Sequence, residues 1–443
     1  NKLKISSKNL KKNRIKLTRN LLNKGKNILF NRIKLTRNLL TAGINIIIYL
    51  KNLYIFKFKK FLLGPKPTRF VTLIIFNLFI NFQIFLKSKI YIIFYFPKHI
   101  YHYLTIGDFK KRLSYHRNLD KVISYLQNKD ISKLAIFLGY HHSSKLPLSN
   151  KTYIKSLLNC GFKVIYLHNG YLNQDVIKEL EKLNCQVICR LNYGHDIGAC
   201  KDINLLINNL GISMKIEWLL WCNDSNYFLG GESGAIFEKN FMKCLSKKKF
   251  DVITMWESKS IKSHCQSYFL CFNRKVINSK VYKKFWKNYA PLPYRSHAIY
   301  NGEIALSQRV LNRFNIQTIY NSKSIYKNIL NNENYKNFGN ILKYLPDSFC
   351  SDLNLNKKYF LFSKKELQLL INELEVHNPS HTYAYLNIVT NKSPFLKKDI
   401  IKAKSFSYES AKNFILKYFY FPDTELAIEI LTELKRSKDL IKK

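Results

Sequence analysis

Asp224 is the residue whose place in the sequence most clearly points to chemistry. It follows a short apolar run at residues 218–222 and stands in the middle of Asn223-Asp224-Ser225. A run of that length is typical of a fully buried strand in a parallel sheet, and such sheets bind ligands just beyond their carboxyl ends. A carboxylate there can hold Mg²⁺ or Mn²⁺ against a diphosphate. An ordinary surface turn after a strand is the competing interpretation.

A second polar stretch lies one helix length upstream. Asn192, Gly194, Asp196 and Gly198 alternate with other residues, and the stretch leads into a predicted helix. Glycine-spaced loops that open helices approach phosphates and sugars closely. Either stretch alone would favour a surface turn. The two in succession favour a binding site.

Two further groups of residues have types suited to a sugar substrate. His264, Gln266 and Ser267 form the polar beginning of a strand predicted at 264–272, where they can hydrogen-bond a sugar or a phosphate. A lone strand-end histidine is more often satisfied locally. Glu303 is predicted in the first turn of a helix at 304–311. There it either stabilises the helix dipole or acts as a general base on an acceptor hydroxyl.

The elements that must position these residues lie between residues 108 and 330, where short apolar runs alternate with amphipathic segments. This alternation predicts right-handed crossovers and a Rossmann-like, mostly parallel sheet with helices on both faces. Strands are predicted at 133–138, 162–167, 186–190, 218–222, 251–256 and 264–272, and helices at 148–160, 175–183, after Gly198 and at 304–311.

The chain is long enough, at 443 residues, for two or three domains. Its formal net charge is +46, which at first suggests nucleic acid. The charge is unevenly placed, because 22 Lys and Arg and no Asp or Glu precede Asp108. Anionic lipid is a natural partner for such a segment, so we expect an anionic membrane surface and no nucleic acid.

Residues 1–107 are predicted to form a basic, apolar helical arm that associates with membranes. The sequence NRIKLTRNLL occurs at 13–22 and again at 31–40, a spacing of five helical turns that places both copies on one face. A chance duplication is a competing explanation. Residues 70–86 carry no charge, and 17 residues are at the lower limit for a span. A membrane-associated helix pair is preferred over a true span or a core helix.

Residues 331–443 are predicted to be a helical cap on the sheet domain. Helices are expected at 366–374, 408–421 and 423–434, and a polar loop at 331–340 is expected over the site. The turn Asn378-Pro379-Ser380-His381 either points His381 towards an acceptor or caps a helix.

The assembled stretches resemble the rhamnan synthesis protein F family of bacterial polysaccharide glycosyltransferases. The resemblance runs in order from about residue 133 to 401. It is carried by RLNYGHDIGACKD, LLWCNDSNYF, HCQSYFLCFNRKVI, GEIALSQRVL and NPSHTYAYLNIVTNKSPFLKKDII. It implies a GT-A-like α/β fold and a membrane-associated enzyme at the cytoplasmic face of the inner (plasma) membrane, either peripheral or with a single anchor.

The resemblance also implies a reaction and roles for the residues. A deoxysugar such as rhamnose would move from a nucleotide-diphospho-sugar donor to a lipid-linked glycan acceptor in cell-wall or O-antigen synthesis. The roles carried over are nucleotide-sugar binding by the loop Asn192, Gly194, Asp196 and Gly198, cation binding by Asp224 between Asn223 and Ser225, base catalysis by Glu303, and sugar binding by His264, Gln266 and Ser267. The expected cofactor is a divalent cation, Mg²⁺ or Mn²⁺.

Two other function classes stay open at this point. A basic nucleic-acid-binding protein would interleave Lys and Arg with aromatic residues on one face. A catalytically inactive transferase homologue would keep the fold and lose nucleotide binding.

Overall fold

A computed structural model describes most of the chain from residue 109 onwards. The described residues are 109–113, 119–128, 130–141, 143–247, 249–332, 341–347, 364–418 and 424–442. The chain divides into two units, residues 1–104 and 105–443, and every described residue lies in the second. The predicted arm at 1–107, with its repeat and its uncharged run, lies outside the described residues. Among the helices that are described, none is long and apolar enough to cross a membrane.

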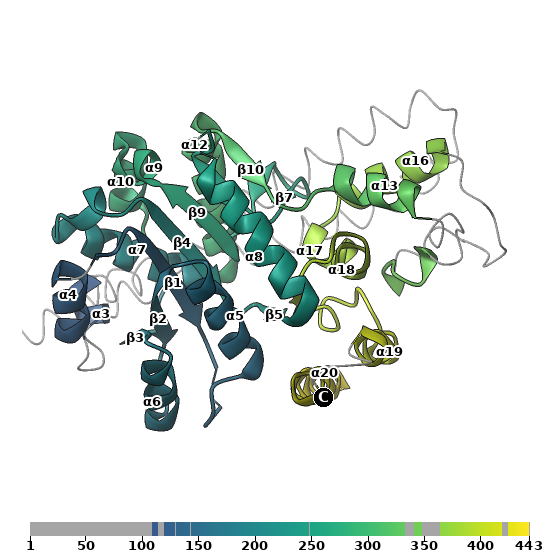
Figure 1. The fold of residues 1–443 in the computed structure, drawn as a ribbon, viewed down its shortest axis with the longest axis horizontal. Coiled ribbons are helices and arrows are strands. Elements are labelled where there is room, and N and C mark those ends of the chain that lie inside the picture. The colour runs from purple at the N-terminus through teal and green to yellow at the C-terminus, as the bar shows by residue number, and fades with distance from the viewer. Residues whose placement is uncertain are drawn as a thin grey trace, which may run out of the picture. The chain divides into compact units, whose positions relative to one another are not determined.

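A seven-stranded sheet forms the centre of the described part (Figure 1), with the strand order β10-β6-β9-β4-β1-β2-β3. The strands are β1 (Lys133–Gly139), β2 (Lys163–Asn169), β3 (Gln186–Arg190), β4 (Trp218–Asn223), β6 (Val252–Thr254), β9 (Phe269–Asn273) and β10 (Ile316–Thr318). All pairings are parallel except those of β9, which runs antiparallel to both β4 and β6. The predicted fold class, a mostly parallel α/β sheet flanked by helices, is confirmed.

The strands form where the apolar runs predict them because both faces of the sheet are covered. All six residues of β4 are buried, as are six of the seven in β1. The chain builds outwards from β1, first to β2 and β3 on one side and then back to β4 on the other. Such a reversal leaves a crevice beyond the carboxyl ends of β1 and β4, where ligands of open α/β sheets bind.

The strand predicted at 264–272 is wrong as a single element. Residues 264–265 form β8 (His264–Cys265), which pairs with β7 (Glu257–Ser258) in a separate ribbon, and only β9 enters the sheet. The direction of β9 has a useful consequence. Because it is antiparallel, its amino end, with Ser267 just before it, lies at the same sheet edge as the carboxyl ends of β4 and β6.

Helices cover both faces. Buried side chains of α5 (Leu148–Asn159), α6 (Gln174–Lys182) and α8 (Gly231–Ser246) pack on one face, which is the near side in Figure 1. The other face is covered by α3 (Phe109–Leu113), α4 (Leu119–Asn128), α7 (His195–Asn209), η1 (Ile212–Met214), α9 (Arg274–Asn278), α10 (Lys280–Asn288), α12 (Ala305–Arg309) and η3 (Leu311–Arg313). In α6 the amphipathic pattern works as predicted, because Val176, Ile177 and Leu180 are buried and Asn173 caps the helix by accepting from the Asp175 N–H.

Two helices begin earlier than predicted, and both changes affect candidate residues. α7 starts at His195, so Asp196 and Gly198 belong to its first turn instead of a loop before it. Glu303 does not lie in a first helical turn. It is near the end of η2 (Ala298–Ile304), a π-helix that follows α11 (Arg295–His297) and runs directly into α12. The helix-dipole role of Glu303 is therefore wrong. Single-turn π segments inside helices occur often at functional sites.

The C-terminal region adds helices and one short strand. It contains α13 (Ser322–Asn331), which the sequence did not predict, and then α16 (Lys364–Glu375), α17 (Pro379–Thr382), α18 (Ala384–Asn391), β11 (Phe395–Lys397), α19 (Tyr408–Tyr418) and α20 (Thr424–Lys442). Strand β11 pairs antiparallel with β5 (Asn226–Phe228), which follows Asp224 directly. Apolar residues of α16, α18 and β11 join the core on the α5 side of the sheet. Of the loop predicted at 331–340, Asn331 is instead the last residue of α13, and residues 333–340 lie outside the described residues.

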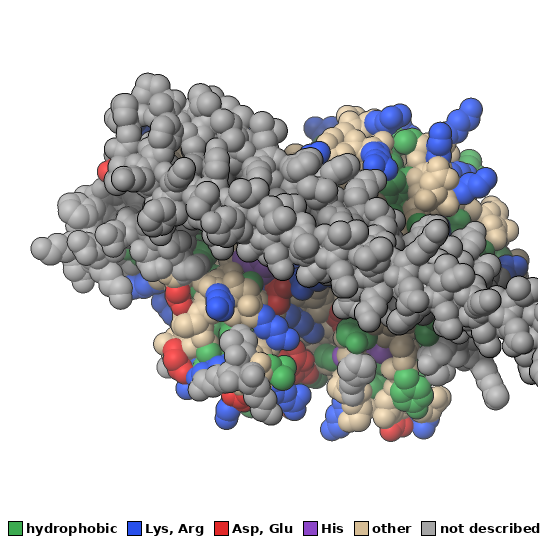
Figure 2. All heavy atoms as spheres, turned by 180° about the vertical axis from the view of Figure 1, so that it is seen from behind, with side chains coloured by type: hydrophobic (Ala, Val, Ile, Leu, Met, Phe, Trp, Pro, Cys, Tyr) green, Lys and Arg blue, Asp and Glu red, His purple; other side chains and the backbone are tan. Residues whose placement is uncertain are grey.

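Basic side chains are numerous on the surface of the described residues. On the face shown in Figure 2, Lys and Arg side chains are spread across the visible part, with Asp and Glu among them.

Candidate active site

Asp224 lies at the carboxyl ends of β1 and β4, where the sheet topology predicts a ligand site. Its backbone N–H donates to the carbonyl of Leu138 at the end of β1 (3.1 Å), and its Oδ2 accepts from the backbone N–H of Tyr140 (2.9 Å). The side chain thus bridges the ends of β4 and β1 at the point where the chain reverses. Burial raises the pKa of this carboxyl group, and Lys398 opposes the rise.

Asp196 is brought next to Asp224 from the start of α7. The Nδ2 of Asn223 donates to Asp196 Oδ2 (2.8 Å), while its Oδ1 accepts from the backbone N–H and hydroxyl of Ser225 (3.1 and 2.6 Å). Burial, together with the neighbouring Asp224, raises the pKa of Asp196 to about 6. Two half-buried carboxylates therefore lie close enough to interact, and Asn223 orients that of Asp196.

The two glycines of the upstream stretch allow close backbone packing. Gly194 has a φ of +82°, which favours glycine, and a Cβ on it would lie 2.5 Å from Cβ of Pro291. A Cβ on Gly198 would lie 2.4 Å from the carbonyl oxygen of Tyr193. Asn192, at the start of the stretch, is exposed. The glycines thus set the position of the first turn of α7, and with it the position of Asp196.

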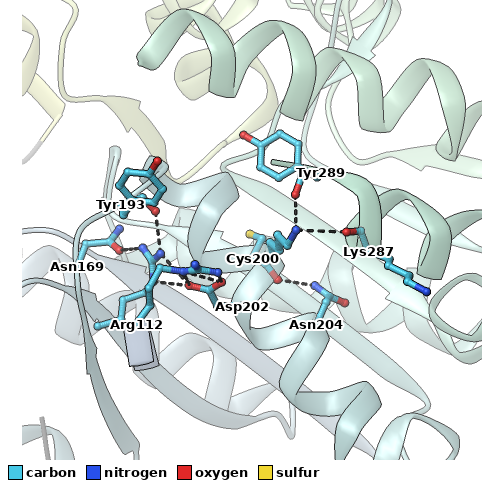
Figure 3. A network of polar contacts seen from close by, with 10 residues as sticks. Arg112, Asn169, Tyr193, Cys200, Asp202, Asn204, Lys287 and Tyr289 are labelled. Carbon is cyan, nitrogen blue, oxygen red and sulfur yellow. Dashed lines mark hydrogen bonds and ion pairs between the residues drawn. The ribbon is translucent and has the colours of Figure 1, made fainter. Parts of the chain in front are cut away.

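A buried ionic network supports this turn from below (Figure 3). Arg190, at the end of β3, donates through Nη2 to the carbonyl of Tyr193 (2.8 Å) and to Asp202 Oδ2 (2.9 Å). Asp202 also accepts from Arg112 Nη2 on α3 (2.6 Å), and Arg190 Nη1 donates to Asn169 Oδ1 (2.5 Å). Arg190 and Asp202 are fully buried. Burial lowers the pKa of Arg190, and Asp202 opposes the change.

Glu303 reaches the same edge from η2. Its Oε1 accepts from the backbone N–H of Ser267 (2.5 Å), just before β9. The carbonyl of the next residue, Tyr268, accepts from the Asn223 N–H (3.3 Å). Glu303 is therefore tied to the strand that neighbours β4, although no hydrogen bond joins it directly to Asp196 or Asp224.

His264 and Gln266 make contacts of a different kind. His264 is buried, and its Nδ1 lies 2.6 Å from the carbonyl of Lys262. Gln266 donates to Asn378 Oδ1 (2.9 Å) and accepts from the Ser380 hydroxyl (2.7 Å). It also lines a cavity of about 20 Å³, which is room for about one water molecule. In this structure Gln266 joins two protein segments, and His264 is satisfied locally.

Sequence reasoning did not identify Lys397, at the end of β11. It lies opposite Asn226 in the β5–β11 ribbon, and the Lys398 N–H donates to the carbonyl of Ser225 (3.1 Å). Burial lowers the pKa of Lys397, while Asp399, Glu303 and Asp196 oppose that change. The positive charge of Lys397 therefore interacts with both Asp196 and Glu303, which share no hydrogen bond with each other. The resemblance covered these residues, but nothing local marked one lysine among 74 basic residues.

The turn from Asn378 to His381 caps a helix and also brings His381 to Asp399. Asn378 caps α17 by accepting from the Ser380 N–H, as its competing interpretation held. His381 Nε2 lies 2.8 Å from Asp399 Oδ1, and Arg295 lies 3.4 Å from Asp399 Oδ2. Burial tends to raise the pKa of Asp399, but its bond to His381 and the charge of Lys397 hold that pKa below its usual range.

The structure thus brings most of the predicted residues to one sheet edge. Asp196, Asn223 and Ser225 form a continuous hydrogen-bonded group, Asp224 lies beside it with its own bonds to the end of β1, and Glu303 and Ser267 form a further pair. A cavity of about 510 Å³ lies elsewhere, lined by residues of α10, η2 and η3 among others, and none of the predicted site residues lines it.

A divalent cation has a partial set of ligands at this edge. No three His, Cys, Asp or Glu side chains in the described ranges lie close enough together to hold a metal ion. Asp196 and Asp224 supply two carboxylates, and Mg²⁺ is commonly held by one or two carboxylates with substrate phosphates and water completing the shell. The residues fit a cation that binds together with a diphosphate.

Residues 241–420 match the family model of rhamnan synthesis protein F, a range that includes Glu303 and Lys397 but neither Asp196 nor Asp224. No curated protein matches the chain.

Two solved structures of the glycosyltransferase GlyE from Streptococcus pneumoniae TIGR4, one of them in the apo form, are similar at 10% identity. The alignments cover 60% of this chain, and the chain spans 65% and 64% of their length, with TM-scores of 0.25 and 0.26. Scores this low do not establish a common fold. The resemblance drawn from the sequence is confirmed by the family model, and residues 241–420 carry the rhamnan synthesis protein F pattern.

Proposed function

We propose that this protein is a glycosyltransferase of polysaccharide synthesis, which moves a sugar from a nucleotide-diphospho-sugar donor to a glycan acceptor. The family match supports a role in such synthesis. The observation that carries the proposal is the sheet edge beyond β1 and β4, where Asp224 bridges both strand ends and Asp196 lies beside it. Crevices at this point of an α/β sheet are the usual ligand sites.

The donor is proposed to bind with its diphosphate near Asp224. A bound Mg²⁺ or Mn²⁺ would neutralise charge on the diphosphate and so favour its departure. Asp196 and Asp224 supply the carboxylates. Their raised pKa values have burial as the main cause, and for Asp196 the adjacent charge of Asp224 adds to it. A cation between them would relieve that repulsion.

Glu303 is proposed as the general base towards the acceptor. Its Oε1 is held by the Ser267 N–H, which fixes the direction of the carboxylate at the sheet edge. A base within reach of the acceptor hydroxyl takes its proton as the oxygen attacks the sugar carbon, and inversion of configuration follows from attack opposite the leaving diphosphate. Loss of such a base typically lowers the rate by about 10²–10⁴-fold.

The finer assignments follow from the resemblance and the basic arm. The proposed donor sugar is a deoxysugar such as rhamnose, and the acceptor is a lipid-linked glycan of the cell wall or O-antigen. The proposed location is the cytoplasmic face of the inner membrane, with residues 1–107 binding its anionic surface.

A panel of nucleotide-diphospho-sugars tests this function. Purified full-length protein is incubated with each donor and Mg²⁺ or Mn²⁺, and the release of nucleoside diphosphate is measured with and without glycan acceptors. We expect release with at least one donor and its loss in Asp224→Asn. Absence of both binding and release for every donor, in a folded protein, would identify an inactive homologue and contradict the proposal.

A further inference from the structure

Lys397 is fixed at the candidate site by the pairing of β11 with β5. Its partner in the ribbon is Asn226, two residues after Asp224, and Lys398 N–H donates to the carbonyl of Ser225. The ribbon brings a segment from the C-terminal region back against the loop that follows β4. Because the apolar residues of both strands are buried, the pairing holds the backbone of Lys397 at this edge.

The surroundings of Lys397 are acidic, yet its ammonium makes no hydrogen bond or ion pair with any described residue. Asp399, Glu303 and Asp196 all favour its charged form. The neighbouring basic side chains do have direct partners. Arg295 and His381 contact Asp399 at 3.4 and 2.8 Å. Lys398 lies over the ring of Tyr227 and 3.8 Å from Glu433.

The ammonium of Lys397 belongs to a half-buried side chain, and its three N–H donors have no acceptor among the described residues. A bound anion would supply those acceptors. The proposed donor carries a diphosphate, and at this edge that diphosphate faces Asp196, Asp224 and Glu303. Without a cation of the protein beside it, the three carboxylates would repel it.

We propose that Lys397 binds the diphosphate of the nucleotide-sugar donor directly, as a protein cation of the site that sequence reasoning did not find. This rests on the proposed function. During transfer the bond from the sugar carbon to the diphosphate oxygen breaks and its electron pair stays on that oxygen. The acceptor oxygen bonds to the carbon, and its proton passes to Glu303. Lys397 then lies beside the charge that develops on the leaving diphosphate, where a fixed cation stabilises the transition state.

The competing account is that Lys397 only offsets the charge of its acidic neighbours. The two accounts differ in what its removal changes. A diphosphate-binding lysine is needed for ligands that carry phosphate and not for the nucleoside alone. A lysine that serves the fold would alter stability and leave the preference for phosphate unchanged.

Isothermal titration of the full-length protein separates these accounts. The probes are UDP, dTDP and the matching nucleosides, each with Mg²⁺ and with EDTA. Lys397→Met keeps the length of the side chain and removes the charge, Lys397→Arg keeps the charge, and Lys402→Met is a control at an exposed lysine nearby. Charge-assisted hydrogen bonds are strong enough that we expect Lys397→Met to weaken diphosphate binding by about 10- to 100-fold.

The remaining expected results are specific. Nucleoside affinity is unchanged in Lys397→Met, Lys397→Arg stays within about fivefold of wild type, and Lys402→Met matches wild type. Equal diphosphate affinity in Lys397→Met and wild type overturns the inference while the proposed function stands. Failure of the wild-type protein to bind any nucleoside diphosphate overturns both.

A measurement on the wild-type protein covers the case in which Lys397→Met does not fold. Acetylation of each lysine is followed by mass spectrometry with and without the nucleoside diphosphate. We expect the ligand to slow acetylation of Lys397 and to leave Lys402 unaffected. Equal acetylation rates at Lys397 with and without saturating ligand would overturn the inference.

Discussion

Two clusters of charge lie at opposite ends of the first turns of α7, and they are built on different principles. In the lower one, Arg112, Asp202 and Arg190 are buried and every charge touches an opposite one. In the upper one, Asp196 and Asp224 are partly exposed, share a like charge and have raised pKa values. A paired cluster stabilises a fold. An unmatched cluster costs stability and is retained where a ligand completes it.

The comparison therefore predicts opposite responses to removal of a carboxylate. Loss of one from the lower cluster should damage the fold, and loss of one from the upper cluster should damage function. The following variants test that contrast, from the largest expected effect to the smallest.

Asp202→Ala should be the most harmful change. It leaves the guanidinium groups of Arg112 and Arg190 buried without their counter-charge, and breaking a buried pair in this way costs about 3–5 kcal/mol. Urea unfolding followed by circular dichroism measures the loss. A decrease below about 1 kcal/mol would place this network among weak surface pairs and remove the contrast.

Asp224→Asn should leave the fold intact and abolish most of the activity. The amide oxygen can still accept from the Tyr140 N–H, so the end of β1 keeps its bond. Loss of one charged group of this kind lowers turnover on the order of 10²-fold or more. Donor turnover and the melting temperature are measured together. A large fall in Tm with unchanged turnover per folded molecule would reverse the assignment of this residue.

Gly198→Ala tests the link between the clusters. The carbonyl of Tyr193 that Arg190 holds is the one that a Cβ on Gly198 would approach to 2.4 Å. Because that atom belongs to the backbone, we expect a loss of about 1–3 kcal/mol and reduced donor affinity through displacement of Asp196.

Gly234→Ala is the matched control for this variant. Gly234 lies inside α8, and its added Cβ would meet only Phe228 at an ordinary distance of 3.5 Å. Alanine there should stabilise the protein by up to about 1 kcal/mol. Equal unfolding midpoints for the two variants would show that the first turn of α7 tolerates displacement.

Asp196→Asn should give the smallest change in stability, and it should stabilise the protein slightly. The folded pKa of about 6 lies above the ordinary value of 3.8, so the native state binds the proton more tightly than the unfolded state. Ionisation therefore costs stability as pH rises from about 4 to about 6, and the full cost persists above that range. The amide should raise Tm slightly at pH 7.5.

The pH dependence of this gain is its control. Below about pH 4 the wild-type carboxyl is neutral in both states, and the two proteins should melt alike. Donor binding in the wild type should also weaken as pH falls through about 6, because the carboxylate is lost. A lower Tm for Asp196→Asn at pH 7.5 would contradict the reading of this group as an unmatched charge.

Much of the sheet was predictable because burial on both faces requires continuous apolar runs. The strands β1 to β4 lie within a residue or two of the predicted ranges, and Asp224 follows β4 as expected. The direction of β9 was not predictable, since an apolar run is the same for both directions. The polar residues before it were assigned to one strand, and a separate ribbon formed instead.

The candidate site was predictable in part. Asp224 was found because it follows a strand whose type the sequence reveals. Asp196 and Glu303 were found as carboxylates next to predicted helices, although both helices begin earlier than predicted. The roles of Gly194 and Gly198 were assigned to phosphate approach, whereas the structure shows them packed against Pro291 and Tyr193. Lys397 was missed because its place depends on a pairing between residues far apart in the sequence.

The pairing of β11 with β5 also has a consequence for the order in which the parts of the candidate site come together during synthesis. Ribosomes deliver β1 to β5 first, and these strands can associate as soon as they emerge. Strand β11 follows β5 only after residues 229–394 have been translated. A nascent polypeptide would therefore hold the acidic end of β4 before it gains the lysine of β11.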